Sequence, residues 1–307
     1  MGNDEEHGYG SKKGVVTNYS FFLTNTQIRS TISLHKKCNK YNKIAQEVQV
    51  GGYMKTIVIA NQKGGIGKTT TSTALASILT EKGYKTLLID TDVQCNSSDT
   101  YRAKIKETAT LYDVLLDDDR ISLEEAIQHT EMGDIVAADP LLRRADSILD
   151  ADRANGVFRL KDALEELNGY DYVVVDTAPS MNSLLQNCLV AADEVIIPLT
   201  ADRYSVQGLS ELNNTINATK KRQNPNLNVA GLLLVKYNKR TLLSKEVKES
   251  LEEIAEKMRT KLFTTTIRES TKAREAQATC TTLIKYDSNS TTAKDYRDFV
   301  NELIGEK

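Results

Sequence analysis

The sequence predicts an α/β fold, a mostly parallel sheet with helices on both faces. Short apolar segments alternate with longer helical segments along the chain after residue 54. Some strands, such as residues 172–175, are apolar throughout, and a strand of that kind is buried on both of its faces. A glycine-rich loop also joins the first of these strands to a helix, which is a common arrangement at the carboxyl ends of the strands in a parallel sheet.

The individual elements follow from their apolar spacing and their terminal residues. We expect strands at residues 56–60, 86–90, 134–138, 172–176, 194–198 and 229–235. We expect helices at residues 69–82, 123–130, 159–167, 246–261 and 293–304. Gly83 ends the first helix, since glycine readily adopts the left-handed conformation that closes helices. No glycine- or proline-rich linker divides the region after Met54, so we expect one domain over residues 54–307.

The first 53 residues differ from the rest of the chain. They are rich in glycine and charge at the start and show no sustained helical or strand periodicity. We expect either a poorly ordered extension or an upstream segment that precedes the true start at Met54. A short DNA- or partner-binding arm is the functional alternative.

Composition narrows the class of protein. The 307 residues are 40% hydrophobic and 27% charged, with a formal net charge of −2. Bulk charge therefore does not indicate a nucleic-acid binder, and any DNA contact must come from a local basic face. The four cysteines are widely spaced without a CxxC pair, which argues against zinc and disulfides and favours a cytoplasmic location.

The loop of residues 61–70 reads NQKGGIGKTT and carries the main chemical signal. It follows a strand and opens a helix, as a phosphate-binding loop must. The nucleotide-binding residues are expected to be Lys63, Gly64, Gly65, Ile66, Gly67, Lys68, Thr69 and Thr70. Glycines allow backbone N–H groups to surround phosphate, and the helix N-terminus adds its positive dipole end.

Two lysines in this loop have different expected roles. Lys68 is placed to contact the β- and γ-phosphates, and the Thr69 hydroxyl is placed to ligate Mg²⁺. Lys63 occupies the position that makes this a deviant Walker A motif. Its side chain need not serve its own nucleotide, and we expect it to reach the phosphates of a partner subunit, as an arginine finger does.

Carboxylates end two of the predicted strands. Asp90 and Asp92 follow the second strand, and Asp176 ends the strand at residues 172–176. The carboxyl ends of parallel strands face the ligand crevice, so all three should lie near the loop. Asp176 is expected to hold Mg²⁺ as a Walker B acid, directly or through water, and Asp92 is expected to orient the attacking water. For Asp90, a structural role in fixing the local backbone is as well supported as a role in the reaction.

Together these motifs resemble the ParA family of DNA-partition ATPases, within the wider MinD/ParA group. The resemblance rests on the deviant loop, on residues 90–96 (DTDVQCN), on residues 170–180 (YDYVVVDTAPS), on residues 191–198 and on Gln207-Gly208-Leu209. It covers about 250 residues, from Met54 to the end of the chain. Lys63, Lys68, Thr69, Asp92 and Asp176 match the functional positions of the family.

The resemblance implies a weak cytoplasmic Mg-ATPase that forms a homodimer around ATP. In that state such proteins bind non-specific DNA and associate with the nucleoid, and a ParB-like centromere-binding protein stimulates hydrolysis. The cargo would be a plasmid, a chromosome or a mobile element. Candidate DNA contacts are Arg240, Lys272, Arg274 and Lys294, supported by Lys239. An ordinary solvated basic face is the alternative reading of these residues.

Some positions depart from the family pattern. Val93 and Cys95 stand where relatives have proline and glycine, and we expect only local changes there. Arg268 and Ser270 replace the proline and asparagine that help relatives hold adenine, which leaves the basis of adenine selectivity open. The arginines that relatives often carry near the C-terminus are absent.

Three other functions share parts of this pattern. A MinD-like positioning ATPase would need a basic amphipathic C-terminal helix, whereas residues 295–307 are rich in acidic side chains, so we expect no membrane partner. A nitrogenase-iron-protein-like reductase would need cluster-bridging cysteines, for which Cys188 alone is suggestive. A nucleotide-sensing adaptor that barely hydrolyses ATP is the third possibility.

Overall fold

The computed structural model describes residues 54–117, 119–240 and 242–306. The proposed extension, residues 1–53, lies outside the described residues, so its interpretation and the boundary at Met54 stay predictions.

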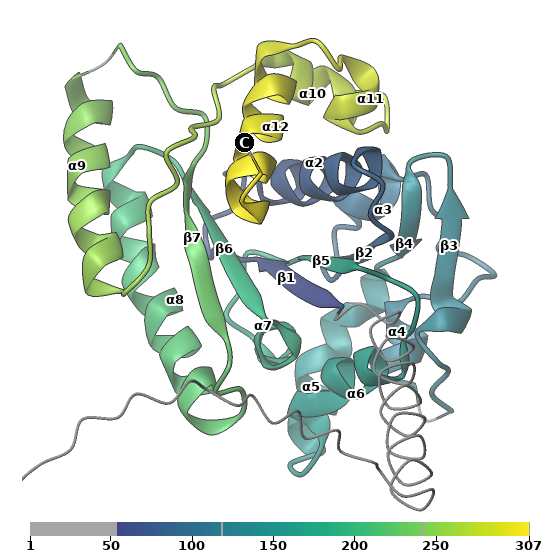
Figure 1. The fold of residues 1–307 in the computed structure, drawn as a ribbon. Helices are drawn as coiled ribbons and strands as arrows, with labels where there is room; N and C mark the ends of the chain where they lie inside the picture. Colours follow the sequence, from purple (N-terminus) through teal and green to yellow (C-terminus); the bar gives the residue numbers. More distant parts are fainter. Residues whose placement is uncertain (1–53, 118, 241, 307) are drawn as a thin grey trace, which may run out of the picture. The chain divides into compact units, whose positions relative to one another are not determined.

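A seven-stranded sheet organises the described part of the chain (Figure 1). Its spatial order is β3-β4-β2-β5-β1-β6-β7. Neighbouring strands are parallel except for the antiparallel pair at the β3 edge. The strands are β1 Lys55–Ile59, β2 Thr86–Asp90, β3 Ile127–Thr130, β4 Gly133–Val136, β5 Tyr172–Asp176, β6 Glu194–Leu199 and β7 Asn228–Leu234. The predicted mostly parallel α/β fold is thereby confirmed.

Helices cover both faces of this sheet. They are α2 Lys68–Glu81, α3 Asn96–Thr100, α4 Leu111–Leu115, α5 Ala145–Ala151, α6 Arg159–Glu166, α7 Ser183–Ala191, α8 Arg203–Arg222, α9 Leu242–Lys257, α10 Thr271–Ala278, α11 Leu283–Tyr286 and α12 Thr291–Ile304. Short 3₁₀ turns span Glu124–Ala126, Pro140–Arg144 and Gly156–Phe158. None of the helices in the described ranges combines the length and the apolar character needed to cross a bilayer.

Strand β1, which lies next to the central strand β5, divides its side chains between two cores. Val58 belongs to the core on the face covered by α4 to α9, whereas Ile57 and Ile59 belong to the core beneath α2 and α12. Successive strand residues point to opposite faces, and both faces here are buried. This explains why β1 and β5 read as continuous apolar runs rather than as alternating ones.

One expected helix is wrong. Residues 123–130 form a 3₁₀ turn followed by strand β3, which pairs antiparallel with β4. Strand β4 begins directly after the turn, at Gly133, whose φ of 131° is a conformation that favours glycine. Tertiary pairing with β4 decides this segment, because four residues are too few for a periodicity to separate strand from helix.

Helix α8 is an element beyond those expected from the sequence. It runs for 20 residues along one side of the sheet, toward the β7 end in the view of Figure 1. Its buried side chains include Leu209, Leu212 and Ile216, which are spaced by three and four positions and enter the same core as α7.

The last helix packs on the helix that follows the glycine-rich loop. The Tyr296 hydroxyl lies 3.1 Å from the Thr71 hydroxyl in a buried contact, and Arg297 pairs with Glu81 at 3.1 Å. Phe299 and Val300 are fully buried in the same core. The apolar face of α12 therefore belongs to the interior of the domain (Figure 1).

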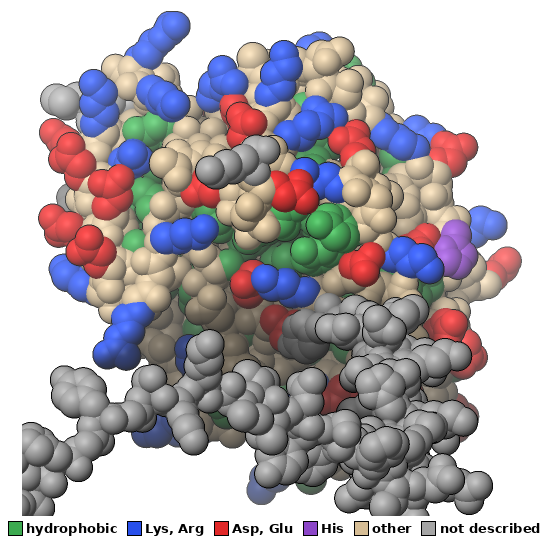
Figure 2. Space-filling model, viewed as in Figure 1, with side chains coloured by type: hydrophobic (Ala, Val, Ile, Leu, Met, Phe, Trp, Pro, Cys, Tyr) green, Lys and Arg blue, Asp and Glu red, His purple; other side chains and the backbone are tan. Residues whose placement is uncertain are grey.

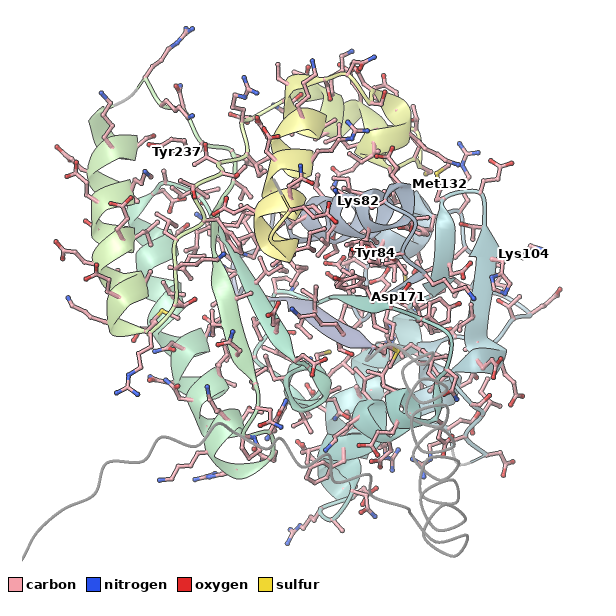
Figure 3. The ribbon with its side chains drawn as sticks, in the orientation of Figure 1. Lys82, Tyr84, Lys104, Met132, Asp171 and Tyr237 are labelled. Carbon is pink, nitrogen blue, oxygen red and sulfur yellow. The ribbon has the colours of Figure 1, made fainter. Side chains whose placement is uncertain are left out.

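Contacts at the amino ends of β2 and β5 fix the alignment of these strands. The Lys85 N–H donates to the Asp171 carboxylate at 2.8 Å, and Tyr84 meets Tyr172 edge to face at 5.1 Å between ring centroids. Figure 3 shows Tyr84 and Asp171 close together at this edge. The register that results places Asp90 opposite Asp176 at the other end of the two strands.

Candidate active site

The loop between β1 and α2 has the backbone that phosphate binding requires. Gly65 has φ 69° and Gly67 has φ 104°, both in the left-handed region that L side chains rarely adopt. A Cβ added to Gly64, Gly65 or Gly67 would meet no heavy atom within 4 Å. The loop therefore presents open backbone at the N-terminus of a 14-residue helix, which suits an anionic group.

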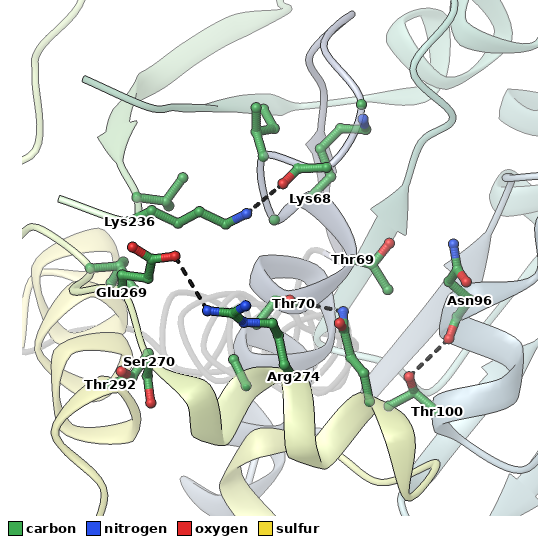
Figure 4. A pocket seen from close by; sticks show the side chains of 18 of the residues that line it. Lys68, Thr69, Thr70, Asn96, Thr100, Lys236, Glu269, Ser270, Arg274 and Thr292 are labelled. Atoms are coloured by element: carbon green, nitrogen blue, oxygen red, sulfur yellow. Dashed lines mark hydrogen bonds and ion pairs between the residues drawn. The ribbon is translucent and has the colours of Figure 1, made fainter. Parts of the chain in front are cut away.

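This loop forms one wall of a cavity of about 620 Å³. Residues 64–70 line it together with Asp92, Asn96 and Thr100, and the opposite wall comes from the end of β7 and from α10 (Figure 4). The volume lies within the usual range for small-molecule sites. Predicted loop residues and one predicted carboxylate thus share a single cavity.

Lys68 is buried at the base of this cavity. Its ammonium donates to the main-chain carbonyl of Lys63 at 3.2 Å. Burial lowers the pKa of Lys68, while the charges of Asp176 and Asp92 oppose that shift. A partly desolvated ammonium attracts phosphate more strongly than a solvated one, because water screens it less.

Asp176 lies fully buried behind the loop. Its carboxylate accepts hydrogen bonds from Ser72 at 3.0 Å and from Ser97 at 2.8 Å. Burial raises the pKa of Asp176, and hydrogen bonds from Ser97, Thr69 and Ser72 together with the charge of Lys68 act against the rise. The structure therefore brings together Thr69, Lys68 and Asp176, which were expected to meet.

This donor set fits Mg²⁺. A threonine hydroxyl and a nearby carboxylate supply the hard oxygen ligands that Mg²⁺ prefers, with water completing its coordination. Both oxygens of Asp176 already accept a serine hydroxyl, so a contact with the ion through water is the more natural one.

Asp92 and Asp90 take different positions after β2. Asp92 lines the cavity, and one of its oxygens accepts the Gln94 N–H at 3.0 Å. Asp90 is fully buried and accepts the Asp92 N–H, the Ser98 N–H and the Ser98 hydroxyl. Burial and the nearby Asp176 raise the pKa of Asp90 to about 7. Asp90 thus fixes the backbone that carries Asp92.

Lys63 points away from the cavity of its own chain. Among the described residues, those lining the cavity begin at Gly64 and do not include Lys63. Its ammonium lies 2.7 Å from the Asp202 carboxylate and 3.5 Å from the Thr200 hydroxyl. Burial tends to raise the pKa of Asp202, but hydrogen bonds from Lys63, Thr200 and Ser205 prevail and lower it to about 2.

The wall formed by residues 266–270 departs from the family pattern in a specific way. The Arg268 guanidinium pairs with Asp295 of α12, with contacts of 2.6 and 2.9 Å. The Arg268 backbone N–H also donates to Asp295 at 3.0 Å. Ser270 caps α10 by accepting the Lys272 N–H. Arg268 thereby ties the cavity wall to the helix that packs on the phosphate-loop helix.

The candidate DNA contacts do not share one environment. Lys272 pairs with Glu275 at 2.8 Å, and Arg274 lies 3.6 Å from Glu269 and lines the cavity (Figure 4). Arg240 and Lys294 are exposed. Figure 2 shows Lys and Arg side chains along the upper edge of this face, above the ends of α9 and α10.

Three residues of the site were not expected from the sequence. Ser72 and Ser97 hold Asp176, and Lys236 donates from the end of β7 to the Gly65 carbonyl at 2.6 Å (Figure 4). Ser72 lies one helical turn after Lys68, a spacing that places both on one side of α2 and that signals its role. No sequence pattern indicates the role of Lys236, because it lies 171 positions from Gly65 and only the folded structure brings the two together.

The cysteines show no arrangement for a metal cluster in the described ranges. Cys188 is fully buried in α7, and burial raises the pKa of its thiol to about 12. Cys95 is buried beside Asp90 and adopts φ 54°, the left-handed conformation for which relatives use glycine. Cys95 therefore holds a backbone conformation that glycine adopts more easily, and it places a thiol in the core.

Comparisons with known proteins agree with this geometry. A family model described as an AAA domain matches residues 54–229. The chromosome partitioning protein ParA of Myxococcus xanthus is 35% identical over 254 residues, which cover 81% of this chain and 88% of that protein. The sporulation initiation inhibitor protein Soj of Bacillus subtilis is 36% identical over 254 residues, covering 81% and 98%.

The fold also matches a structure with a bound nucleotide. Cobyrinic acid a,c-diamide synthase from Mycobacterium smegmatis, with bound ATP analogue and magnesium, superposes with a TM-score of 0.70. It is 29% identical, and the match covers 82% of this chain and 94% of that one.

Proposed function

Because this chain belongs to the ParA family of partition ATPases, we propose that it is an ATP-driven switch that dimerises around Mg-ATP and then binds DNA without sequence preference. Its cargo would be a plasmid, a chromosome or a mobile element. A ParB-like partner would stimulate hydrolysis and release the dimer. The protein would act in the cytoplasm, on the nucleoid in its ATP state.

One observation carries this proposal. The glycine-rich loop and Lys68 face the chain's own cavity, whereas Lys63 of the same loop points out of it. A lysine in the phosphate loop that does not line its own site is available to a second subunit. Charge supplied from a partner at the transition state is an established way to control nucleotide hydrolysis.

The chain's own residues divide the chemistry among them. The loop N–H groups and Lys68 bind the phosphates, and Thr69 with Asp176 would hold Mg²⁺. When bound, Mg²⁺ neutralises the charge that develops on the phosphate oxygens. Asp92 would orient the attacking water and accept its proton, as its place at the cavity wall allows. We expect weak intrinsic turnover, because a switch needs a long-lived ATP state.

The test measures oligomeric state and DNA binding in the same samples. Wild-type protein and the Lys63→Ala variant are incubated with a non-specific duplex and with ADP or ATP, and mass photometry follows the dimer. We expect the wild-type protein to dimerise and to bind DNA in a salt-sensitive manner with ATP but not with ADP. Both properties should be lost in the Lys63→Ala variant. A wild-type protein that stays monomeric with ATP would refute the dimer switch.

A second function is favoured by one feature of the basic face. Lys272 and Arg274 each lie close to a glutamate of the same chain, which weakens their attraction for phosphate. A positioning ATPase that acts on a cargo other than DNA would retain the ATP dimer without DNA binding. Dimerisation without DNA binding in the same experiment would support it.

A further inference from the structure

The contact between Lys63 and Asp202 spans two structural elements. Lys63 belongs to the loop after β1, and Asp202 belongs to the turn between β6 and α8, 139 positions later. Asp202 accepts the Ser205 N–H at 3.0 Å through its other oxygen, so it also caps the start of α8. The carboxylate is therefore held in place whether or not Lys63 is near.

The strand that leads into this turn, β6, is itself joined to the phosphate loop. The Asn61 side-chain amide donates to the Pro198 carbonyl at 2.8 Å, and its oxygen accepts the Lys63 N–H at 2.9 Å. The end of β6 and the start of the loop thus form one connected unit. Within it the Lys63 side chain is 39% exposed and the Asp202 side chain 34%, so a second molecule can reach both.

The loop also links Lys63 to the phosphate-binding lysine. The Lys68 ammonium donates to the Lys63 carbonyl at 3.2 Å. A phosphate that draws Lys68 toward itself removes this bond from the peptide that carries Lys63. Occupation of the cavity therefore changes the hydrogen bonding of the peptide unit from which the Lys63 side chain extends.

We propose that Asp202 is a positioning residue that retains the Lys63 ammonium within its own chain and so opposes delivery of that ammonium to a partner's phosphates. This inference rests on the proposed function, in which Lys63 acts across a dimer. A lysine engaged by a carboxylate must lose that partner before it can neutralise phosphate elsewhere. Formation of one dimer would break two such contacts, one in each subunit. The contribution of the contact to the free energy of dimerisation is therefore doubled.

The informative variant is Asp202→Asn. Asparagine caps a helix about as well as aspartate, so the start of α8 is preserved while the charge that holds Lys63 is lost. Asp152→Asn is the matched control, because Asp152 forms a comparable ion pair with Arg159 at 3.0 Å on another part of the chain. Asp202→Glu keeps the charge and should restore wild-type behaviour at least in part.

Two measurements distinguish the Lys63–Asp202 contact itself from its effect on dimerisation. With ADP, the rate of Lys63 acetylation by acetic anhydride is followed by mass spectrometry, with Lys161 as the internal reference. We expect an increase of about threefold in Asp202→Asn, the scale of an exposed ion pair. With saturating Mg-ATP, the dimer dissociation constant should fall by about tenfold, since two contacts are relieved.

Each outcome has a distinct meaning. Faster acetylation and a tighter dimer in Asp202→Asn, absent in Asp152→Asn and reversed in Asp202→Glu, support the inference. An unchanged acetylation rate, or an unchanged or weaker dimer while the wild-type protein dimerises normally, overturns it and leaves the proposed function intact. A wild-type protein that fails to dimerise with ATP overturns the proposed function, and this inference with it.

Discussion

The ammonium of Lys236 lies 2.6 Å from the main-chain carbonyl oxygen of Gly65, although 171 positions separate the two residues. Gly65 is one of the two loop glycines with positive φ, so this contact supports the bend of the phosphate loop. Lys236 also lines the cavity and adds a positive charge beside it (Figure 4).

Replacing Lys236 should weaken nucleotide binding. We expect Lys236→Met to raise the dissociation constants for ATP and ADP by about fivefold, the effect of losing roughly 1 kcal/mol at an exposed charged contact. Isothermal titration calorimetry measures both constants. Lys239→Met, at a neighbouring exposed position, is the control and should bind normally. Equal affinities for the two variants would contradict a role for Lys236.

Asp92 should separate nucleotide binding from hydrolysis. We expect Asp92→Ala to bind ATP normally and to lose about 100-fold in the rate of phosphate release, because positioned proton transfer contributes at least that factor. Asp99→Ala is the control, since Asp99 is an exposed carboxylate that lines the same cavity. A rate in Asp92→Ala within twofold of the control would exclude the assigned role.

At position 95, glycine should give a more stable protein than alanine. The left-handed backbone at φ 54° costs a residue with a Cβ about 1 kcal/mol more than glycine. We therefore expect Cys95→Gly to be about 1 kcal/mol more stable than Cys95→Ala in urea unfolding, although both lose the buried thiol. The opposite order would mean that burial of the Cβ outweighs the backbone strain.

Basic residues that are exposed should contribute more to DNA binding than basic residues that pair with a carboxylate of the same chain. We expect Arg240→Ala to lower the slope of log affinity against log salt by about 0.9, the value for one phosphate contact. Lys272→Ala should change it less, because Lys272 already pairs with Glu275. Fluorescence anisotropy with ATP at several salt concentrations measures these slopes. Lys161→Ala, on α6, is the control, and equal slopes for Arg240→Ala and wild type would remove Arg240 from the interface.

Acid should abolish the contribution of Asp202 to stability. The folded-state pKa of Asp202 is lowered to about 2, below the value of about 3.9 for an unfolded aspartate. The folded protein then binds fewer protons than the unfolded chain between these values, so the contribution is complete above about pH 4 and is lost as the pH falls toward 2. The difference in unfolding free energy between wild type and Asp202→Asn should shrink over this range. A difference that stays constant from pH 7 to pH 3 would contradict the low pKa.

Local sequence determined the elements whose signals are long or chemically specific. The buried strands β1, β2 and β5 and the helix after the phosphate loop were all predicted within one residue of their observed bounds. Buried parallel strands are wholly apolar, and a glycine-rich loop has few other uses between a strand and a helix. The positions of Asp92 and Asp176 near the loop follow from the same topology.

Only the tertiary structure decided the contacts between distant segments. The strand at Ile127–Thr130 exists because β4 pairs with it, and α8 is helical across a mostly polar stretch because one face packs on the sheet. The partners of Lys63 and Gly65, which are Asp202 and Lys236, depend on how the sheet brings β6 and β7 beside β1. Sequence spacing fixes which residues share a helix face or a strand end, whereas contacts across more than 100 positions arise from packing that no local pattern encodes.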